Sequence, residues 1–523
     1  MEKRVLLAAV LSGIVVIVWF SLVAPPRPNV PPPGATPSAV APVGTAATPT
    51  PAPGQSAGPA EPAVPALVGE DAAPLPLAGD GWQASVDPRG GVIASLMVDG
   101  YRDQDGAPMD LVRSGGLLPL AIGAPGAWND AVYRVEKGTG WVRLRWSDGA
   151  GNWVDKRLSS GKGKHALEVE VRSGGIPARA GVIVGTGLEK TLKVDQQSRF
   201  GGADGVVRVG GKLERIAAAK LDGVKSVRGS VDFAGVEDQY FLMVLLPSAA
   251  LDEVRVSASG AGPTALPQVA AVGVGGTVTG TLYAGPKEHG TLGGYGRGLD
   301  ETVSFGIFGI LSIGFLAALR WIHGWVGNWG VAIIVLTAAI RLLLFPLNHK
   351  SAVAMKRMQA LQPKMKAIQD RYQERAKKDP NVRAKMNQEV MQMYKTEGVN
   401  PMGGCLPMLV QLPILWALYS LFAYAIELRQ APFVWWIHDL AAKDPTYITP
   451  ILMTASMVLQ QRMAPQVGDP AQRRMFMLMP FIFGFMFMSF PAGLVLYWLV
   501  NNIFTIGQQM LTEKMMAGAP KTA

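Results

Sequence analysis

The chain has 523 residues, of which 49% are hydrophobic and only 17% are charged, and its formal net charge is +10. This composition is too apolar for an ordinary soluble protein, and the chain is too long for a single domain. The single cysteine, Cys405, excludes an internal disulfide framework. We therefore expect a membrane protein with parts outside the membrane.

Residues 1–24 are predicted to form an uncleaved membrane anchor. Lys3 and Arg4 precede an apolar run that continues to Ala24, which is longer than the roughly 7–15-residue core of a signal peptide. No A-x-A cleavage pattern follows, so we expect the segment to remain attached as an anchor. We expect its amino terminus to lie inside. Residues 25–66 are rich in Pro, Ala, Gly and Thr, and such a composition predicts a linker.

Residues 67–300 are predicted to form a large all-β domain. Stretches such as 141–146 and 166–171 alternate apolar and polar residues and are separated by many glycines, which is the pattern of half-buried strands. The glycine-rich segment 285–290 lacks the G-x-x-x-x-G-K-[ST] pattern of a phosphate loop, so turns are expected there.

Residues 304–323 are predicted to form an interfacial helix on the outer surface. A crossing here would place the basic segment after Arg341 outside. Trp321, Trp325 and Trp329 recur every four residues, as one helix face among lipid headgroups requires. An ordinary buried helix is the alternative.

Residues 329–348 form an apolar segment that is long enough to cross a bilayer and contains Arg341. Arg341 lies seven residues before Asn348, which is roughly 10 Å from the nearer end at a rise of about 1.5 Å per residue. A cation at the centre of such a helix costs about 2.5–3.5 kcal/mol. Arg341 is therefore expected either to snorkel to the interface or to face a polar cavity.

Four further spans are predicted in the rest of the chain, over 404–426, 447–463, 475–490 and 492–511. With the anchor they make six. The segment 350–398 carries 12 Lys or Arg against 5 Asp or Glu, a difference of +7, so it is expected inside, together with the tail over 512–523. The span over 475–490 is only 16 residues long, and such a short span would thin the bilayer.

The last span carries polar side chains at separations of 4, 4 and 3, which place them on one helix face: Tyr497, Asn501, Thr505 and Gln508. Gln411 is expected at the depth of Arg341, and Thr337 shares the helix face of Arg341. No span contains an acidic residue. We therefore predict a polar concavity in the inner half of the membrane, with hydrogen bonding between helices as the alternative.

The spans over 447–490 are rich in methionine and phenylalanine, which suit a surface that accepts many apolar partners. We predict an apolar slide formed by Met457, Met475, Met479, Phe483 and Met486. Packing against lipid is the alternative.

The segment 350–398 is predicted to form an antiparallel helical hairpin. Apolar residues recur at helical spacing on both sides of the turn Asp379-Pro380-Asn381. Its basic face is expected to attract anionic headgroups, ribosomal RNA or acidic protein, and a merely solvated face is the alternative. The basic residues predicted to contact a partner are Lys364, Lys366, Arg371, Arg375, Lys377 and Lys378.

Catalysis finds little support in the sequence. The five histidines are dispersed, and neither an H-E-x-x-H motif nor a pair of cysteines occurs. We therefore expect neither an enzyme nor a metal or cofactor site.

Three segments, Asn400–Pro407, Glu427–Asp439 and Phe490–Tyr497, closely resemble the YidC/Oxa/Alb family of membrane protein insertases. The resemblance covers about 305–512, and the anchor, linker and outer β domain fit the Gram-negative form. It implies a polytopic α-helical membrane protein in which five of the six spans enclose a groove that is open to cytoplasm and lipid. Arg341 would be the groove arginine, with Thr337, Gln411, Tyr497 and Trp498 near it.

The resemblance also implies that both termini are cytoplasmic in the cell inner membrane and that the β domain is a periplasmic β-supersandwich. The implied function is an energy-independent insertase and chaperone for nascent membrane proteins, acting alone or with the Sec translocon. Expected partners are nascent proteins, the ribosome, the signal-recognition targeting system, SecYEG and membrane lipids, but not DNA. An anion-selective channel or solute transporter is the alternative, and a membrane-anchored binding module is a third possibility.

Overall fold

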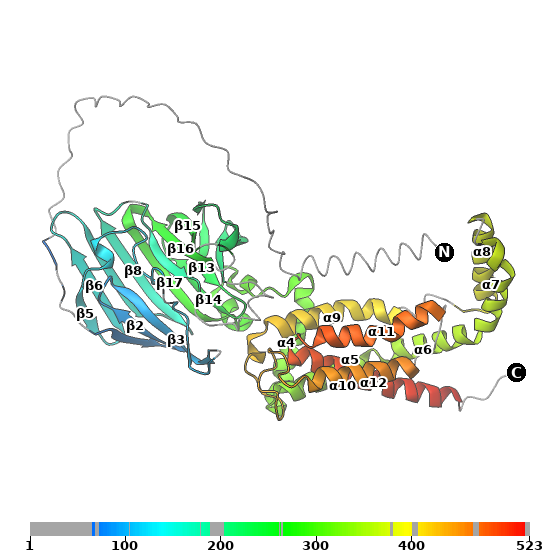
Figure 1. The fold of residues 1–523 in the computed structure, drawn as a ribbon. Coiled ribbons are helices and arrows are strands. Elements are labelled where there is room, and N and C mark those ends of the chain that lie inside the picture. The colour runs from blue at the N-terminus through cyan, green and yellow to red at the C-terminus, as the bar shows by residue number, and fades with distance from the viewer. Residues whose placement is uncertain are drawn as a thin grey trace, which may run out of the picture. The chain divides into compact units, whose positions relative to one another are not determined.

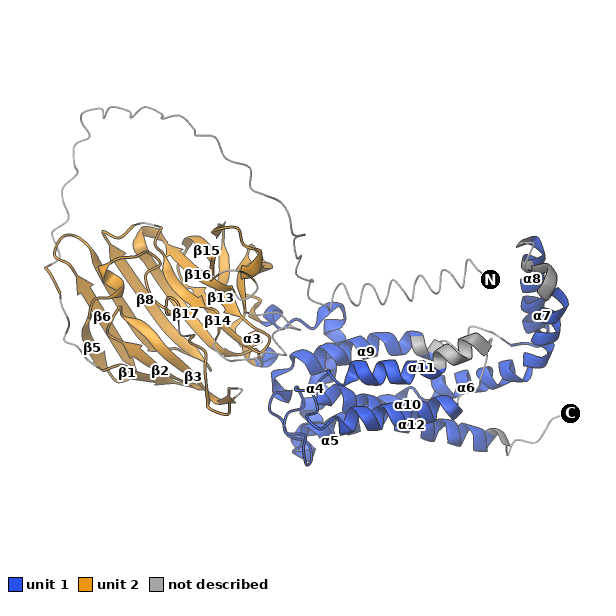
Figure 2. Cartoon of the chain, in the orientation of Figure 1, with its two compact units in different colours: residues 1–12, 288–290, 300–523 blue, residues 13–287, 291–299 orange. Residues whose placement is uncertain are grey.

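The computed structural model describes residues 65–517, apart from residues 68, 70–72, 104, 114, 178, 189–202, 261, 263–264, 377–379, 400–405 and 464–469. The predicted anchor and nearly all of the predicted linker lie outside the described residues. The described chain divides into two compact units, a β domain that ends near residue 299 and a helical domain that follows it (Figure 2).

The strands of the β domain are β1 (Leu75–Gly79), β2 (Trp82–Asp87), β3 (Val92–Arg102), β4 (Pro108–Asp110), β5 (Arg134–Gly138), β6 (Trp141–Ser147), β7 (Trp153–Ser160), β8 (Ala166–Gly174), β9 (Val182–Thr186), β10 (Asp204–Val209), β11 (Lys212–Ala217), β12 (Lys225–Val227), β13 (Val231–Glu237), β14 (Phe241–Pro247), β15 (Leu251–Ser259), β16 (Leu266–Gly273) and β17 (Thr277–Pro286). A nine-stranded sheet has the order β11-β10-β13-β14-β17-β8-β7-β6-β5. Two four-stranded sheets have the orders β1-β2-β3-β4 and β12-β15-β16-β9. The first packs against β7 and β17 and the second against β10, β13 and β14, which makes a β sandwich (Figure 1).

Burial along the strands follows the two patterns expected for a sandwich. In β6, every second residue is buried, at Val142, Leu144 and Trp146, because the other face of this strand is more open. β14 is buried along its whole length, as a central strand must be when both of its faces are covered.

Lys156 of β7 joins the large sheet to the first small sheet. Its side chain is fully buried, and Nζ donates hydrogen bonds to the carbonyl oxygens of Gly90, Gly91 and Leu120 at 2.6, 3.0 and 2.8 Å. Nζ also lies 5.1 Å from the centre of the Tyr133 ring. Burial lowers the pKa of the Lys156 ammonium from 10.5 to about 7, because desolvation disfavours the charged form.

The helices of the second unit are α4 (Gly309–Val326), α5 (Trp329–Leu343), α6 (Phe345–Ala360), α7 (Gln362–Ala376), α8 (Pro380–Thr396), α9 (Leu406–Tyr424), α10 (Ile448–Met463), α11 (Pro470–Phe487) and α12 (Ala492–Ala517). The short α3 (His289–Tyr295) precedes them. α12 is the central helix and packs against α5, α6, α9 and α10, whereas α4 packs against α5 and α9 (Figure 1). Compared with the predicted spans, α11 begins five residues earlier and α12 continues six residues further.

The three tryptophans at positions 321, 325 and 329 do not share one helix, contrary to the prediction. Gly327 ends α4 with a left-handed φ of 67°, and the Asn328 side chain caps α5 by accepting a hydrogen bond from the Val331 N–H at 3.0 Å. Trp329 is therefore the first residue of α5, and its ring stacks on His323.

The apolar stretch Gly306–Val326 has a mean hydropathy of 1.6. Among the described residues it is the one unbroken helical stretch that is long and apolar enough to cross a membrane by those two measures. Trp321 and Trp325 on this stretch are 68% and 79% exposed. The interfacial position of this helix stays a prediction, as does the number of spans.

The predicted span over 329–348 is not one straight helix, so the distance of Arg341 from its end cannot be counted along a single axis to Asn348. α5 ends at Leu343, and α6 continues from Phe345 in a direction bent by 59°. Pro346 lies in the first turn of α6, where it cannot supply the N–H that a continuous helix needs. Arg341 therefore lies in the last turn of α5, and not seven residues inside a longer helix.

The loop over 425–447 packs on the first residues of α5 and α12. The Asn328 side chain donates a hydrogen bond to the Phe433 carbonyl at 3.1 Å, and the Gly493 N–H donates to the Leu440 carbonyl at 2.9 Å. A side chain at position 330 would overlap the Phe433 ring, so glycine is required there. The loop is thus held on the bundle by specific contacts.

α7 and α8 pack on each other, as the predicted hairpin requires. Ile368, Met386 and Val390 are buried between them. The first arm begins at Gln362, because residues 350–360 belong to α6.

We expect the β domain to gain stability as the pH rises from about 7 to 10. The folded-state pKa of Lys156 lies below its unfolded value of 10.5, so between these values the unfolded chain binds more protons. The free energy of unfolding then rises by up to about 1.4 kcal/mol per pH unit, whereas below about pH 7 this dependence vanishes. Denaturant unfolding of residues 65–299 at several pH values measures the slope, which Lys156→Met should remove. An equal slope in the variant would contradict the assignment.

Candidate functional site

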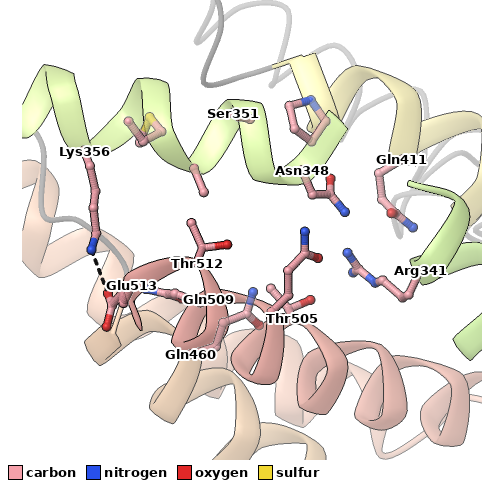
Figure 3. A pocket seen from close by; sticks show the side chains of 14 residues that line it. Arg341, Asn348, Ser351, Lys356, Gln411, Gln460, Thr505, Gln509, Thr512 and Glu513 are labelled. Atoms are coloured by element: carbon pink, nitrogen blue, oxygen red, sulfur yellow. Dashed lines mark ion pairs between the residues drawn. The ribbon is translucent and has the colours of Figure 1, made fainter. Parts of the chain in front are cut away.

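A polar cavity of about 390 Å³ lies between α5, α6, α9, α10 and α12 (Figure 3). Its polar lining consists of Arg341, Asn348, Ser351, Lys356, Gln411, Gln460, Thr505, Gln508, Gln509, Thr512 and Glu513. Of these described residues, three carry charge, and the others are amides or hydroxyls. Ala352, Met355 and Pro407 also line the cavity, so the lining is mixed and offers hydrogen-bonding groups within an otherwise apolar bundle.

Arg341 projects into this cavity from the last turn of α5. Its Nε donates a hydrogen bond to Oδ1 of Asn501 on α12 at 2.6 Å, and the side chain is half-buried. Because Asn501 is neutral, this contact positions the guanidinium without cancelling its charge. A half-buried cation whose described partner is neutral can attract an acidic group that enters the cavity.

A second polar contact joins α9 to α12. Nε2 of Gln411 donates a hydrogen bond to the Tyr497 hydroxyl at 2.9 Å, and Tyr497 is only 2% exposed. One turn further along α12, the buried Asn502 side chain donates to the Ser456 hydroxyl of α10 at 3.0 Å. Polar side chains on three helices are thus satisfied by one another.

The structure brings six of the eight predicted groove residues together. Arg341, Gln411, Thr505 and Gln508 line the cavity, and Asn501 and Tyr497 are hydrogen-bonded to Arg341 and Gln411.

Thr337 and Trp498 are placed elsewhere. Thr337 is 1% exposed, and its hydroxyl donates to the Ile333 carbonyl of its own helix at 2.6 Å. Trp498 packs against Phe483 and Phe487, at ring-centroid distances of 6.4 and 5.0 Å. Both residues support the helices around the cavity and do not line it.

The sequence reasoning missed the wall of the cavity that α6 provides. Asn348, Ser351 and Lys356 line the cavity, but the hydropathy pattern assigned these positions to the end of a span and to the hairpin. On α12 a signal was present, because Thr512 follows Gln508 by four residues and continues the spacing of the polar face. Thr512 also lies 3.1 Å from Nδ1 of His349 on α6.

Exposed apolar side chains lie on the last turn of α5 and along α11. Leu342 and Leu343, which follow Arg341 directly, are 69% and 79% exposed. On α11 the exposed apolar face is formed by Met477, Leu478, Met479, Phe481, Ile482 and Phe485.

The predicted slide residues coincide with this α11 face only at Met479. Met457, Phe483 and Met486 are half-buried. The side chain of Met475 lies outside the described residues.

Three of the predicted partner-binding residues, Lys364, Lys366 and Arg371, are exposed on α7. Lys364 pairs with Glu397 at 2.6 Å and Arg371 pairs with Glu389 at 3.0 Å. The side chain of Arg375 and residues 377 and 378, predicted as Lys377 and Lys378, lie outside the described residues.

Comparison with known proteins connects both units to one family. A family model described as "60Kd inner membrane protein" matches residues 321–519, and one described as "YidC periplasmic domain" matches residues 76–317. A protein of Syntrophus aciditrophicus named "Membrane protein insertase YidC" is 34% identical over 98% of this chain and 100% of its own. The chain belongs to the YidC family of membrane protein insertases. A YidC-family relative from Geobacter metallireducens is 35% identical over 99% of each chain.

The two matched regions correspond to the two units of the structure. This YidC-family chain therefore combines a periplasmic β-sandwich domain with a helical carboxy-terminal region. A solved structure entitled "Active YidC insertase crystal structure with the first transmembrane domain resolved" covers 86% of this chain and 94% of its own, at 18% identity and a TM-score of 0.37. The assignment to the family rests on the full-length sequence matches.

We expect Tyr497→Phe to destabilise the helical domain by about 0.5–2 kcal/mol, because Gln411 loses its buried acceptor. Unfolding in detergent micelles measures this loss, and Gln411→Leu with the double variant completes a mutant cycle. Tyr447→Phe, at a 40% exposed position, is the matched control. A coupling energy of zero between positions 411 and 497 would contradict the proposed contact.

Proposed function

We propose that this chain is a membrane protein insertase and chaperone that moves hydrophobic segments of nascent proteins from the cytoplasm into the inner membrane. The full-length relatives named as insertases support this activity. The observation that carries the mechanism is Arg341, a half-buried cation in a polar cavity whose described partner is the neutral Asn501.

The proposed first step is entry of the polar flank of a substrate into the cavity. A polar or acidic group loses far less solvation in a lining of amides and hydroxyls than in hydrocarbon. Arg341 adds attraction for a carboxylate in surroundings where screening is weaker than in water. The cavity would thereby lower the barrier that such groups meet partway across a bilayer.

The proposed second step is sideways movement of the apolar segment into lipid. Leu342 and Leu343, which follow Arg341 directly, and the exposed face of α11 provide apolar surface on the bundle for this movement. Burying one large apolar side chain contributes about 1.5–3 kcal/mol, so a segment of many such residues supplies its own driving force. No nucleotide is needed for this step.

The proposed topology places the loop over 425–447 at the outer end of the bundle. Its contacts with α5 and α12 would close the cavity toward the periplasm. We infer six spans, with both termini and the α7–α8 hairpin in the cytoplasm. The hairpin would meet the ribosome or the signal-recognition targeting system, and the insertase would work alone or with SecYEG.

Site-specific crosslinking tests the path of the substrate. Photoreactive residues at positions 341, 411 and 501 should form adducts with a stalled nascent membrane protein. Position 310 on α4, which is 92% exposed and outside the cavity lining, is the control. Equal adduct yields from position 310 and from the cavity positions would contradict a defined path.

We expect Arg341→Ala to slow insertion of substrates with acidic translocated tails about five- to tenfold, the loss expected for about 1–1.4 kcal/mol of attraction. Arg341→Lys should retain part of the rate, because it keeps the charge but not the planar donor array. Insertion into reconstituted vesicles measures both rates. Wild-type rates in both variants would rule out the electrostatic role, and anion conductance without substrate would favour a channel instead.

A further inference from the structure

A charged pair, Lys356 and Glu513, lies at the opposite end of the cavity from Arg341 (Figure 3). Nζ of Lys356 on α6 and Oε1 of Glu513 on α12 are 3.6 Å apart, and the two side chains are 35% and 42% exposed. Arg341 contacts α12 at Asn501 and Lys356 contacts it at Glu513. These positions are twelve residues apart, so the two points at which the cations contact α12 are separated by roughly 18 Å along its axis.

The Glu513 carboxylate can be replaced beside Lys356 by another carboxylate. Ion pairs that are partly exposed contribute little to stability, because water solvates both partners and salt screens their attraction. A carboxylate on an incoming segment can therefore replace Glu513 beside Lys356 at small net cost. The separation of the two contact points exceeds the Debye length of about 8 Å at physiological ionic strength, so each cation would act on an acidic group in turn.

Other contacts besides this pair also join α6 to α12. Gln508 of α12 donates a hydrogen bond to the Phe345 carbonyl at 3.2 Å, and His349 lies 3.1 Å from the Thr512 hydroxyl oxygen. These contacts join the same two helices without Lys356 and Glu513. Because these other contacts join the two helices, the pair can have a role besides holding α6 on α12.

We propose that Lys356 is the first cation to bind an acidic flank of the substrate, and that Glu513 is its resting counter-ion, which the flank displaces before it reaches Arg341. This inference rests on the proposed insertase function and adds a determinant of substrate choice. The charge of the flank sets the rate of the first step, separately from the hydrophobicity of the segment. Among the described cavity residues, Lys356 and Arg341 are the two that carry positive charge.

The two neutralising substitutions distinguish this role from a clamp. Lys356→Gln removes the binding cation and should slow insertion of an acidic-flanked substrate about two- to fivefold. Glu513→Gln removes the competing carboxylate and should speed it about twofold. A clamp predicts changes in the same direction, because both variants break the same pair.

The full-length protein in vesicles is tested with two substrates that differ only by Asp→Asn changes in the flank. The asparagine form should show neither effect, and 0.5 M salt should shrink both. Lys225→Gln and Glu214→Gln, which break a β-domain pair of similar exposure at 40% and 43%, are the matched controls and should change nothing.

Opposite effects confined to the acidic substrate would support the proposal. Changes in the same direction, or no difference between the two variants, would overturn it while the insertase function stands. If the wild-type protein inserts neither substrate, the proposed function fails and this inference fails with it.

Discussion

The break between α5 and α6 is the constraint on which the cavity depends. Pro346 prevents α5 from continuing past Leu343, and the chain turns by 59° into α6. α6 then lies along α12, where Gln508 and Thr512 contact it. Without the bend, the polar residues of α6 would extend away from Arg341 and the cavity would lose a wall.

The buried Lys156 of the β domain and the half-buried Arg341 of the helical domain differ in how many of their N–H groups are hydrogen-bonded. In its protonated form, Lys156 of the β sandwich donates one ammonium proton to each of three carbonyl oxygens. Arg341 has five N–H donors, and one of them is bonded to Asn501. The first arrangement is closed and structural, whereas the second keeps hydrogen-bonding capacity directed at a cavity.

Much of the helical domain could be predicted, because helical periodicity fixes which residues share a face. The spacing from Tyr497 to Gln508 therefore indicates a polar face on α12 without any information on tertiary contacts. The bend at Leu344 could not be found from hydropathy, since the apolar run continues through Leu347. The strand order of the nine-stranded sheet pairs segments such as β8 and β17 that are distant in the chain, and alternation within one strand does not specify its partners. The environment of Trp498 likewise depends on where α11 packs.

Leu342 follows Arg341 directly and points to the exposed surface of the bundle, whereas Arg341 points into the cavity. In the proposed mechanism, the boundary between a polar and an apolar environment would therefore pass between these two adjacent residues of α5. Successive residues of a helix differ by about 100° in direction and by about 1.5 Å in height, so the two environments would face two sides of the same helical turn. At such a boundary, each side chain of the substrate would partition separately between the polar and the apolar environment. A segment with mixed character could settle with each side chain on its preferred side and need not cross the membrane as one block.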